Sequence, residues 1–169
     1  MPTTLLPVGR LAPDWRRLFP EIDDWITNDP LKDRQSLTGD GLALSFARTD
    51  TALALAEFSW PSFVVIDDMV LRGYRGDGAD LNEAVAYWMA RGSGDKSATE
   101  SMLNHEHFWH LVQASPPTAE AAMHWGALVR EMWSAKLARD FPDRRFEVEL
   151  HTGPDVERMD HQITFYQLR

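Results

Sequence analysis

The chain has 169 residues, of which 44% are hydrophobic and 25% are charged, and its formal net charge at pH 7 is -9. This composition is typical of a globular protein and argues against a disordered chain, which would be poorer in apolar residues. The absence of cysteine excludes disulfides, thiolate zinc sites and cysteine nucleophiles.

The acidic residues are spread along the chain, and no basic stripe is present, so we do not expect nucleic-acid binding. No apolar run approaches the roughly 20 residues that a membrane-spanning helix needs, and the first residues do not resemble a signal peptide. We therefore expect a cytoplasmic protein that does not bind membranes. The length fits one globular domain over residues 1–169.

Residues 1–13 contain three prolines and are expected to form an extended arm. Alternating large apolar residues predict a half-buried strand over 41–48. The next segment, 51–58, is ambiguous, because its leucines alternate as in a strand whereas its alanines favour a short helix.

Two β-rich runs, 63–66 and 69–71, are separated by Asp67 and Asp68, which is the pattern of a tight hairpin. A pair of aspartates makes a weaker turn than Asn-Gly, because each aspartate must adopt an unusual backbone angle.

Three helices are predicted after the hairpin. The first runs from Leu81 to about Arg91 and has one apolar stripe. The second begins at a capping box formed by Ser97 and Glu100 and continues to about Gln113. The third runs from a cap at Thr118 to about Arg139, and its predicted inward face consists of Ala122, Trp125, Val129, Met132 and Leu137.

Two further strands are predicted over 145–151 and 161–168. Large side chains on both faces of the last strand place it inside the sheet. The predicted fold class is α+β, because a run of helices separates two groups of strands. We expect an antiparallel or mixed sheet of four or five strands built from residues 41–72 and 145–168, with a three-helix block over 81–140 packed on one face.

Three histidines within residues 104–110 suggest a metal site. If this segment is helical, His105 and His107 point to nearly opposite sides, whereas His107 and His110 share one face. Together with His124 from the next helix, His107 and His110 would hold a divalent transition metal. Glu106 would serve as a fourth ligand or as a base. The simpler interpretation is that these histidines line a helix interface, so no metal or other cofactor is expected.

Candidate binding residues are Trp60, which stands beside a proline at a strand entrance, and the turn residues Asp67 and Asp68. A tryptophan at such a position is more often core than anchor, and adjacent aspartates at a hairpin tip are usually a solvated turn.

No catalytic motif is recognisable, so the favoured function is a non-catalytic acidic binding module. One such function is an immunity-like inhibitor whose partner, a protein or toxin, presents a basic surface. The alternative is a metal-dependent enzyme that uses His107, His110 and His124. The sequence leaves the oligomeric state open.

Overall fold

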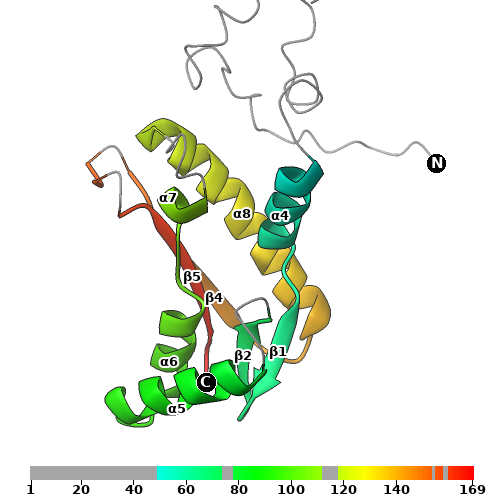
Figure 1. The fold of residues 1–169 in the computed structure, drawn as a ribbon, viewed down its shortest axis with the longest axis vertical. Coiled ribbons are helices and arrows are strands. Elements are labelled where there is room, and N and C mark those ends of the chain that lie inside the picture. The colour runs from blue at the N-terminus through cyan, green and yellow to red at the C-terminus, as the bar shows by residue number, and fades with distance from the viewer. Residues whose placement is uncertain (1–48, 74–77, 112–117, 154, 158–159) are drawn as a thin grey trace, which may run out of the picture. The chain divides into compact units, whose positions relative to one another are not determined.

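The computed structural model describes residues 49–73, 78–111, 118–153, 155–157 and 160–169 (Figure 1). All of them belong to one compact unit, Arg48–Arg169. The predicted arm over 1–13 and the predicted strand over 41–48 lie outside the described residues, and the single-domain prediction stays a prediction. The elements are α4 (Thr49–Ser59), β1 (Phe63–Ile66), β2 (Met69–Arg72), α5 (Gly78–Arg91), α6 (Lys96–Leu103), β3 (Glu106–His107), α7 (Phe108–Leu111), α8 (Ala119–Asp140), β4 (Phe146–His151) and β5 (Gln162–Gln167).

Helices and antiparallel strands are combined in the described residues, which confirms the α+β class. The strands form two sheets instead of one: a hairpin of β1 and β2, and a three-stranded sheet in the order β3-β5-β4. The last strand, β5, occupies the middle position, as its large side chains predicted. In the described part of the chain, no helix is both long and apolar enough to cross a bilayer.

The predicted hairpin of β1 and β2 forms around Asp67 and Asp68, with Ile66 opposite Met69. Both turn residues take positive φ angles, 48° at Asp67 and 69° at Asp68, as a two-residue turn that matches the strand twist requires. Tertiary contacts offset this unfavourable backbone. The Arg144 guanidinium forms an ion pair with the Asp68 carboxylate at 2.9 Å, and Lys96 Nζ donates to the Asp67 carbonyl at 2.7 Å.

The ambiguous segment 51–58 is helical and lies within α4. The end of this helix is fixed by the core: Phe58 is buried, and its carbonyl accepts a hydrogen bond from the indole nitrogen of Trp133 at 2.8 Å. A tertiary contact between residues 75 positions apart thus stabilises the end of a helix that the sequence pattern alone did not distinguish from a strand.

The second predicted helix is shorter than expected and starts at a different cap. Asp95, not Ser97, is the N-cap of α6, and its carboxylate accepts from the Ala98 amide at 3.0 Å. The helix ends at Leu103, and the chain continues as the short strand β3. The predicted continuation to Gln113 was therefore wrong.

Because Asp95 caps α6, Glu100 is free to point inward, where it is fully buried. Its two oxygens accept from the backbone amides of Val70 on β2, at 2.7 Å, and Gln167 on β5, at 2.8 Å. One turn later Asn104 accepts from the Arg72 amide and donates to the Val70 carbonyl, both at 3.0 Å. The side chains of Glu100 on α6 and of Asn104, its C-cap, thus connect β2 of one sheet with β5 of the other.

The three predicted helices are distributed around the strands. The helix α8 packs on β4 and β5, α6 lies along β5 and β2, and α5 packs on α6. In Figure 1, α8 runs beside β4 and β5, while α5 and α6 lie next to the C-terminus. One face of the β4–β5 pair is therefore covered by α8.

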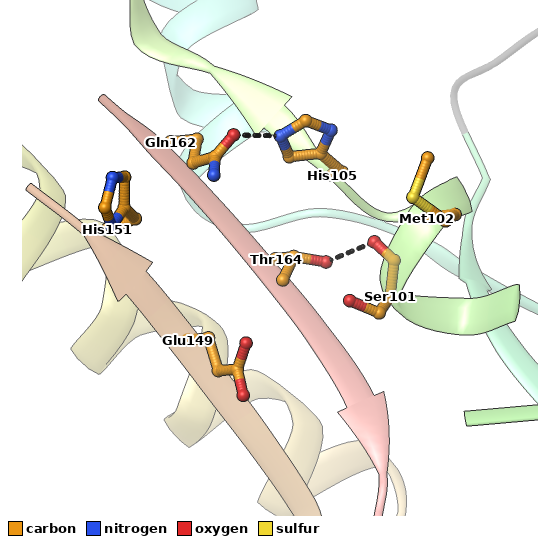
Figure 2. Close-up of a pocket in the computed structure, with 7 residues that line it drawn as sticks. All are labelled: Ser101, Met102, His105, Glu149, His151, Gln162 and Thr164. Carbon is orange, nitrogen blue, oxygen red and sulfur yellow. Dashed lines mark hydrogen bonds between the residues drawn. The ribbon is translucent and has the colours of Figure 1, made fainter. Parts of the chain in front are cut away.

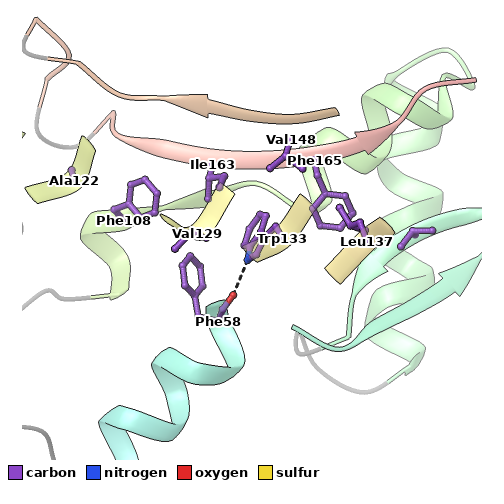
Figure 3. Packing of buried hydrophobic residues seen from close by; sticks show 10 residues of the cluster. Phe58, Phe108, Ala122, Val129, Trp133, Leu137, Val148, Ile163 and Phe165 are labelled. Atoms are coloured by element: carbon purple, nitrogen blue, oxygen red, sulfur yellow. Dashed lines mark hydrogen bonds between the residues drawn. The ribbon is translucent and has the colours of Figure 1, made fainter. Parts of the chain in front are cut away.

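Between α8 and the sheet lies the main hydrophobic core (Figure 3). Val129 and Leu137 face the core, as predicted, but Met132 is 38% exposed and its neighbour Trp133 is fully buried. The Trp133 ring packs at 5.6 Å from the Phe58 ring and 5.7 Å from the Phe165 ring. The inward face of α8 at this point is set by aromatic partners on α4 and β5.

A charged side chain is buried against this core. The Arg72 guanidinium lies 5.0 Å from the Phe58 ring centre and 4.9 Å from that of Trp133. It forms an ion pair at 2.9 Å with Glu106, which is also buried. The Glu106 carboxylate therefore has a structural role, because breaking a buried ion pair leaves an uncompensated charge.

Replacing Glu100 by alanine should destabilise the protein strongly, because two backbone amides on different strands lose their acceptor inside the fold. We expect a loss of about 3–5 kcal/mol in the free energy of unfolding, measured by urea denaturation. The exposed Glu83→Ala variant on α5 is the control and should change stability by no more than about 0.5 kcal/mol. Equal effects of the two substitutions would contradict the bridging role of Glu100.

Candidate functional site

A pocket of about 230 Å³ lies on the face of the β4–β5 pair that α8 does not cover (Figure 2). Strands β4 and β5 form its floor, and the end of α6 with the following loop forms one wall. The lining residues are Ser101, Met102, His105, Glu149, His151, Gln162 and Thr164.

The floor follows from the alternation of side chains along two paired strands. Glu149 lies opposite Thr164, and His151 lies opposite Gln162. Since neighbouring side chains on a strand point to opposite faces, the intervening Leu150 packs against the core below. Polar and apolar residues alternate along β4, and its polar residues form the open face.

Hydrogen bonds from both parts of the wall, α6 and the loop after it, attach the wall to β5. Thr164 Oγ1 donates to the Ser101 carbonyl at 2.6 Å. The His105 ring is hydrogen-bonded through Nε2 to Gln162 Oε1.

Glu149 is the only carboxylate among the lining residues. Its Oε1 accepts from the Tyr166 hydroxyl at 2.6 Å, and this bond to the carboxylate raises the pKa of Tyr166 above its ordinary value. No hydrogen bond to Oε2 is found within the described residues. The pocket therefore offers one carboxylate oxygen, two imidazoles, an amide and hydroxyl groups to a small polar or cationic group.

The residues proposed for metal binding do not have the helical arrangement that motivated them. His107 lies in β3, and its ring centre is 4.5 Å from that of His105, so the two rings are neighbours and do not point apart. His124 lies on α8, and the side chain of His110, in α7, lies outside the described residues.

In the part of the chain that the structure describes, no three or more His, Asp or Glu side chains are arranged to hold a metal ion. The predicted fourth ligand or base, Glu106, is buried against Arg72. Metal binding that involves His110 stays a prediction.

The residues proposed for partner binding are placed at opposite ends of β1. Trp60 is 40% exposed, and the Arg139 guanidinium lies 5.1 Å from its ring centre. Asp67 and Asp68 form the hairpin tip, as the turn interpretation predicted. Seven residues of extended chain span about 20 Å, so these side chains do not converge on one site.

The pocket residues were missed because they are brought together by tertiary structure. The alternation of apolar and polar residues over 146–151 predicts only that Glu149 and His151 point away from the core. His105 was set aside because a helix would point it away from His107. No sequence signal identified Gln162 and Thr164 as their neighbours, because the register between β4 and β5 is not encoded by local spacing.

No protein-family model, curated protein or solved structure matches this chain.

His161, which precedes β5, is a second unusual histidine. Its ring is 1% exposed, and neither ring nitrogen has a hydrogen-bond partner among the described residues. Burial lowers the pKa of His161, and the nearby His151 adds to this effect, whereas Asp160 opposes it. Burial therefore disfavours the charged form of this ring in the folded protein.

Stability should fall as the pH is lowered from about 7 to about 5, because the unfolded chain protonates His161 near its ordinary pKa of about 6.5 while the folded state resists protonation. The variant His161→Leu should show a smaller loss over this range when unfolding is measured by urea denaturation at each pH. Val129→Ala, a buried substitution that leaves every histidine in place, is the control and should keep the wild-type pH dependence although it lowers stability at every pH. An unchanged pH dependence in His161→Leu would contradict this role.

The variant Glu149→Gln should lower the pKa of Tyr166 towards its ordinary value of about 10, because the hydroxyl loses its charged acceptor. Titration of the tyrosine ring carbons by NMR measures this shift. Glu147→Gln, which removes a nearby charge but no hydrogen bond to the Tyr166 hydroxyl, should produce a smaller change. The opposite order of the two effects would show that the Tyr166–Glu149 bond is not the main cause.

Proposed function

We propose that this protein is a non-catalytic binding module that recognises a basic partner through the open face of the β4–β5 pair. The observation that carries the proposal is the placement of Glu149 in the pocket, with one oxygen oriented by Tyr166 and no lysine or arginine among the lining residues. A lysine or arginine side chain of a partner is the complementary group.

A second carboxylate extends this acidic surface beyond the pocket. Glu147 is exposed, and it shares the open face with Glu149 because the two residues are two positions apart on one strand. Like charges held side by side favour a cationic partner and disfavour an anionic one.

The net charge of -9 supports the same class of partner at longer range. An opposite overall charge accelerates encounter and orients the approaching molecule, whereas the local contacts determine how long it stays bound. An inhibitor of a basic protein would use both effects. A cytoplasmic location remains our expectation, since nothing in the sequence points to an oxidising compartment.

Hexalysine peptide is a suitable probe, because it carries the proposed charge without any other feature of a partner. It should bind the full chain at low salt by isothermal titration calorimetry, and the affinity should decrease as salt is added. The Glu147→Gln and Glu149→Gln double variant should bind about 5–10-fold more weakly, since exposed charges contribute up to about 1 kcal/mol each.

The matched control is the double variant Glu57→Gln and Glu83→Gln, which removes the same charge from exposed positions on α4 and α5. This control should bind hexalysine nearly as well as the wild type. If both double variants weaken binding equally, net charge alone attracts the peptide and the proposed site is wrong. Absence of hexalysine binding at low salt would contradict the proposed function itself.

A further inference from the structure

Strand β4 is at the edge of its sheet. It pairs with β5 on one side, and no strand pairs with its other side within the described residues. The direction of its backbone groups follows from one hydrogen bond, in which the Leu168 amide donates to the Arg145 carbonyl at 2.8 Å.

Backbone groups in an antiparallel pair face the neighbouring strand at every second residue. Counting in steps of two from Arg145, the residues of β4 whose amides and carbonyls face β5 are Glu147, Glu149 and His151. The amides and carbonyls of Phe146, Val148 and Leu150 therefore point to the open edge. The backbone amides and carbonyls of these three alternate residues provide the donors and acceptors for one added strand.

A second copy of this chain is a poor occupant of this edge. Antiparallel pairing of β4 with itself about Val148 places Glu147 of one copy opposite Glu149 of the other, on the same face. Like charges directly opposite each other destabilise a strand pair. The same two glutamates favour a strand that carries lysine or arginine at alternate positions, because each basic side chain then lies beside a carboxylate.

The other face of such a strand would meet α8. A hollow of about 380 Å³ lies between β4 and three exposed positions of this helix. Its lining residues are Arg130, Glu131, Ser134, Phe146, Glu147 and Val148. Side chains that alternate with the basic residues would point toward this hollow.

We propose that the basic partner binds as an extended segment added to the free edge of β4, with basic residues at alternate positions beside Glu147 and Glu149. This inference rests on the proposed function and specifies how the partner binds. Main-chain hydrogen bonds to Phe146, Val148 and Leu150 supply affinity, and the alternate side chains supply specificity.

Two peptides of identical composition test the inference with the full-length protein. One alternates, Thr-Lys-Val-Lys-Thr-Lys-Val, and the other groups its lysines, Lys-Lys-Lys-Thr-Val-Thr-Val. Strand addition requires alternation, so the first peptide should bind at least about tenfold more tightly by calorimetry. A version of the first peptide that is N-methylated at the residues facing β4 keeps the charge and should lose this advantage.

Amide hydrogen exchange followed by NMR locates the contact. The alternating peptide should slow exchange at Phe146, Val148 and Leu150. It should leave Glu147, Glu149 and His151 unchanged, because their amides already face β5.

The outcomes separate the two proposals. If both peptides bind equally and no amide on the edge is protected, strand addition is wrong while the proposed function stands. If neither peptide binds, both proposals fail. Slow exchange at Phe146, Val148 and Leu150 in the free protein would show that the edge is already occupied, and it would overturn the inference.

Discussion

The arrangement of the two sheets depends on one buried carboxylate. Glu100 accepts hydrogen bonds from backbone amides on β2 and β5, and the Arg169 guanidinium donates to the same carboxylate at 2.8 and 3.2 Å. Asn104, one turn later, donates to the carbonyls of Val70 and Phe165 at 3.0 and 3.3 Å. The side chains of Glu100 and of the C-cap Asn104 thus occupy the position that a further strand would take between the sheets. Because unsatisfied backbone groups are costly inside a protein, α6 is held firmly in this place.

This constraint also determines where the pocket forms. Since α6 ends at Leu103 beside β5, the chain that follows is extended and pairs with β5 through β3. Extended backbone places His105 and His107 on the same side and turns Glu106 into the core, where it pairs with Arg72. The contacts of Glu100 and Asn104 therefore explain why a wall of the pocket forms beside β5. They also explain why Glu106 is not available as a ligand of the proposed metal site.

The two faces of the β4–β5 pair have different roles. The face toward α8 is apolar and supplies the main core, with Val148 and Phe165 buried beneath it. The opposite face carries Glu147, Glu149 and His151, which the core does not use. A sheet with one covered face and one open edge offers a rigid surface whose polar side chains and backbone groups are already oriented. Such preorganisation reduces the entropic cost of binding a partner.

The sequence alone determined the α+β class, the tight hairpin around Asp67 and Asp68, the Thr118 cap of α8 and the two C-terminal strands. These features depend on local periodicity and on turn and cap chemistry, which act between residues close in the chain. Only the tertiary structure decided that Glu100 is buried and that His105 lies beside Gln162. The physical reason is that side chains far apart in sequence compete for the same buried backbone groups, whereas local patterns depend only on residues close together in the chain.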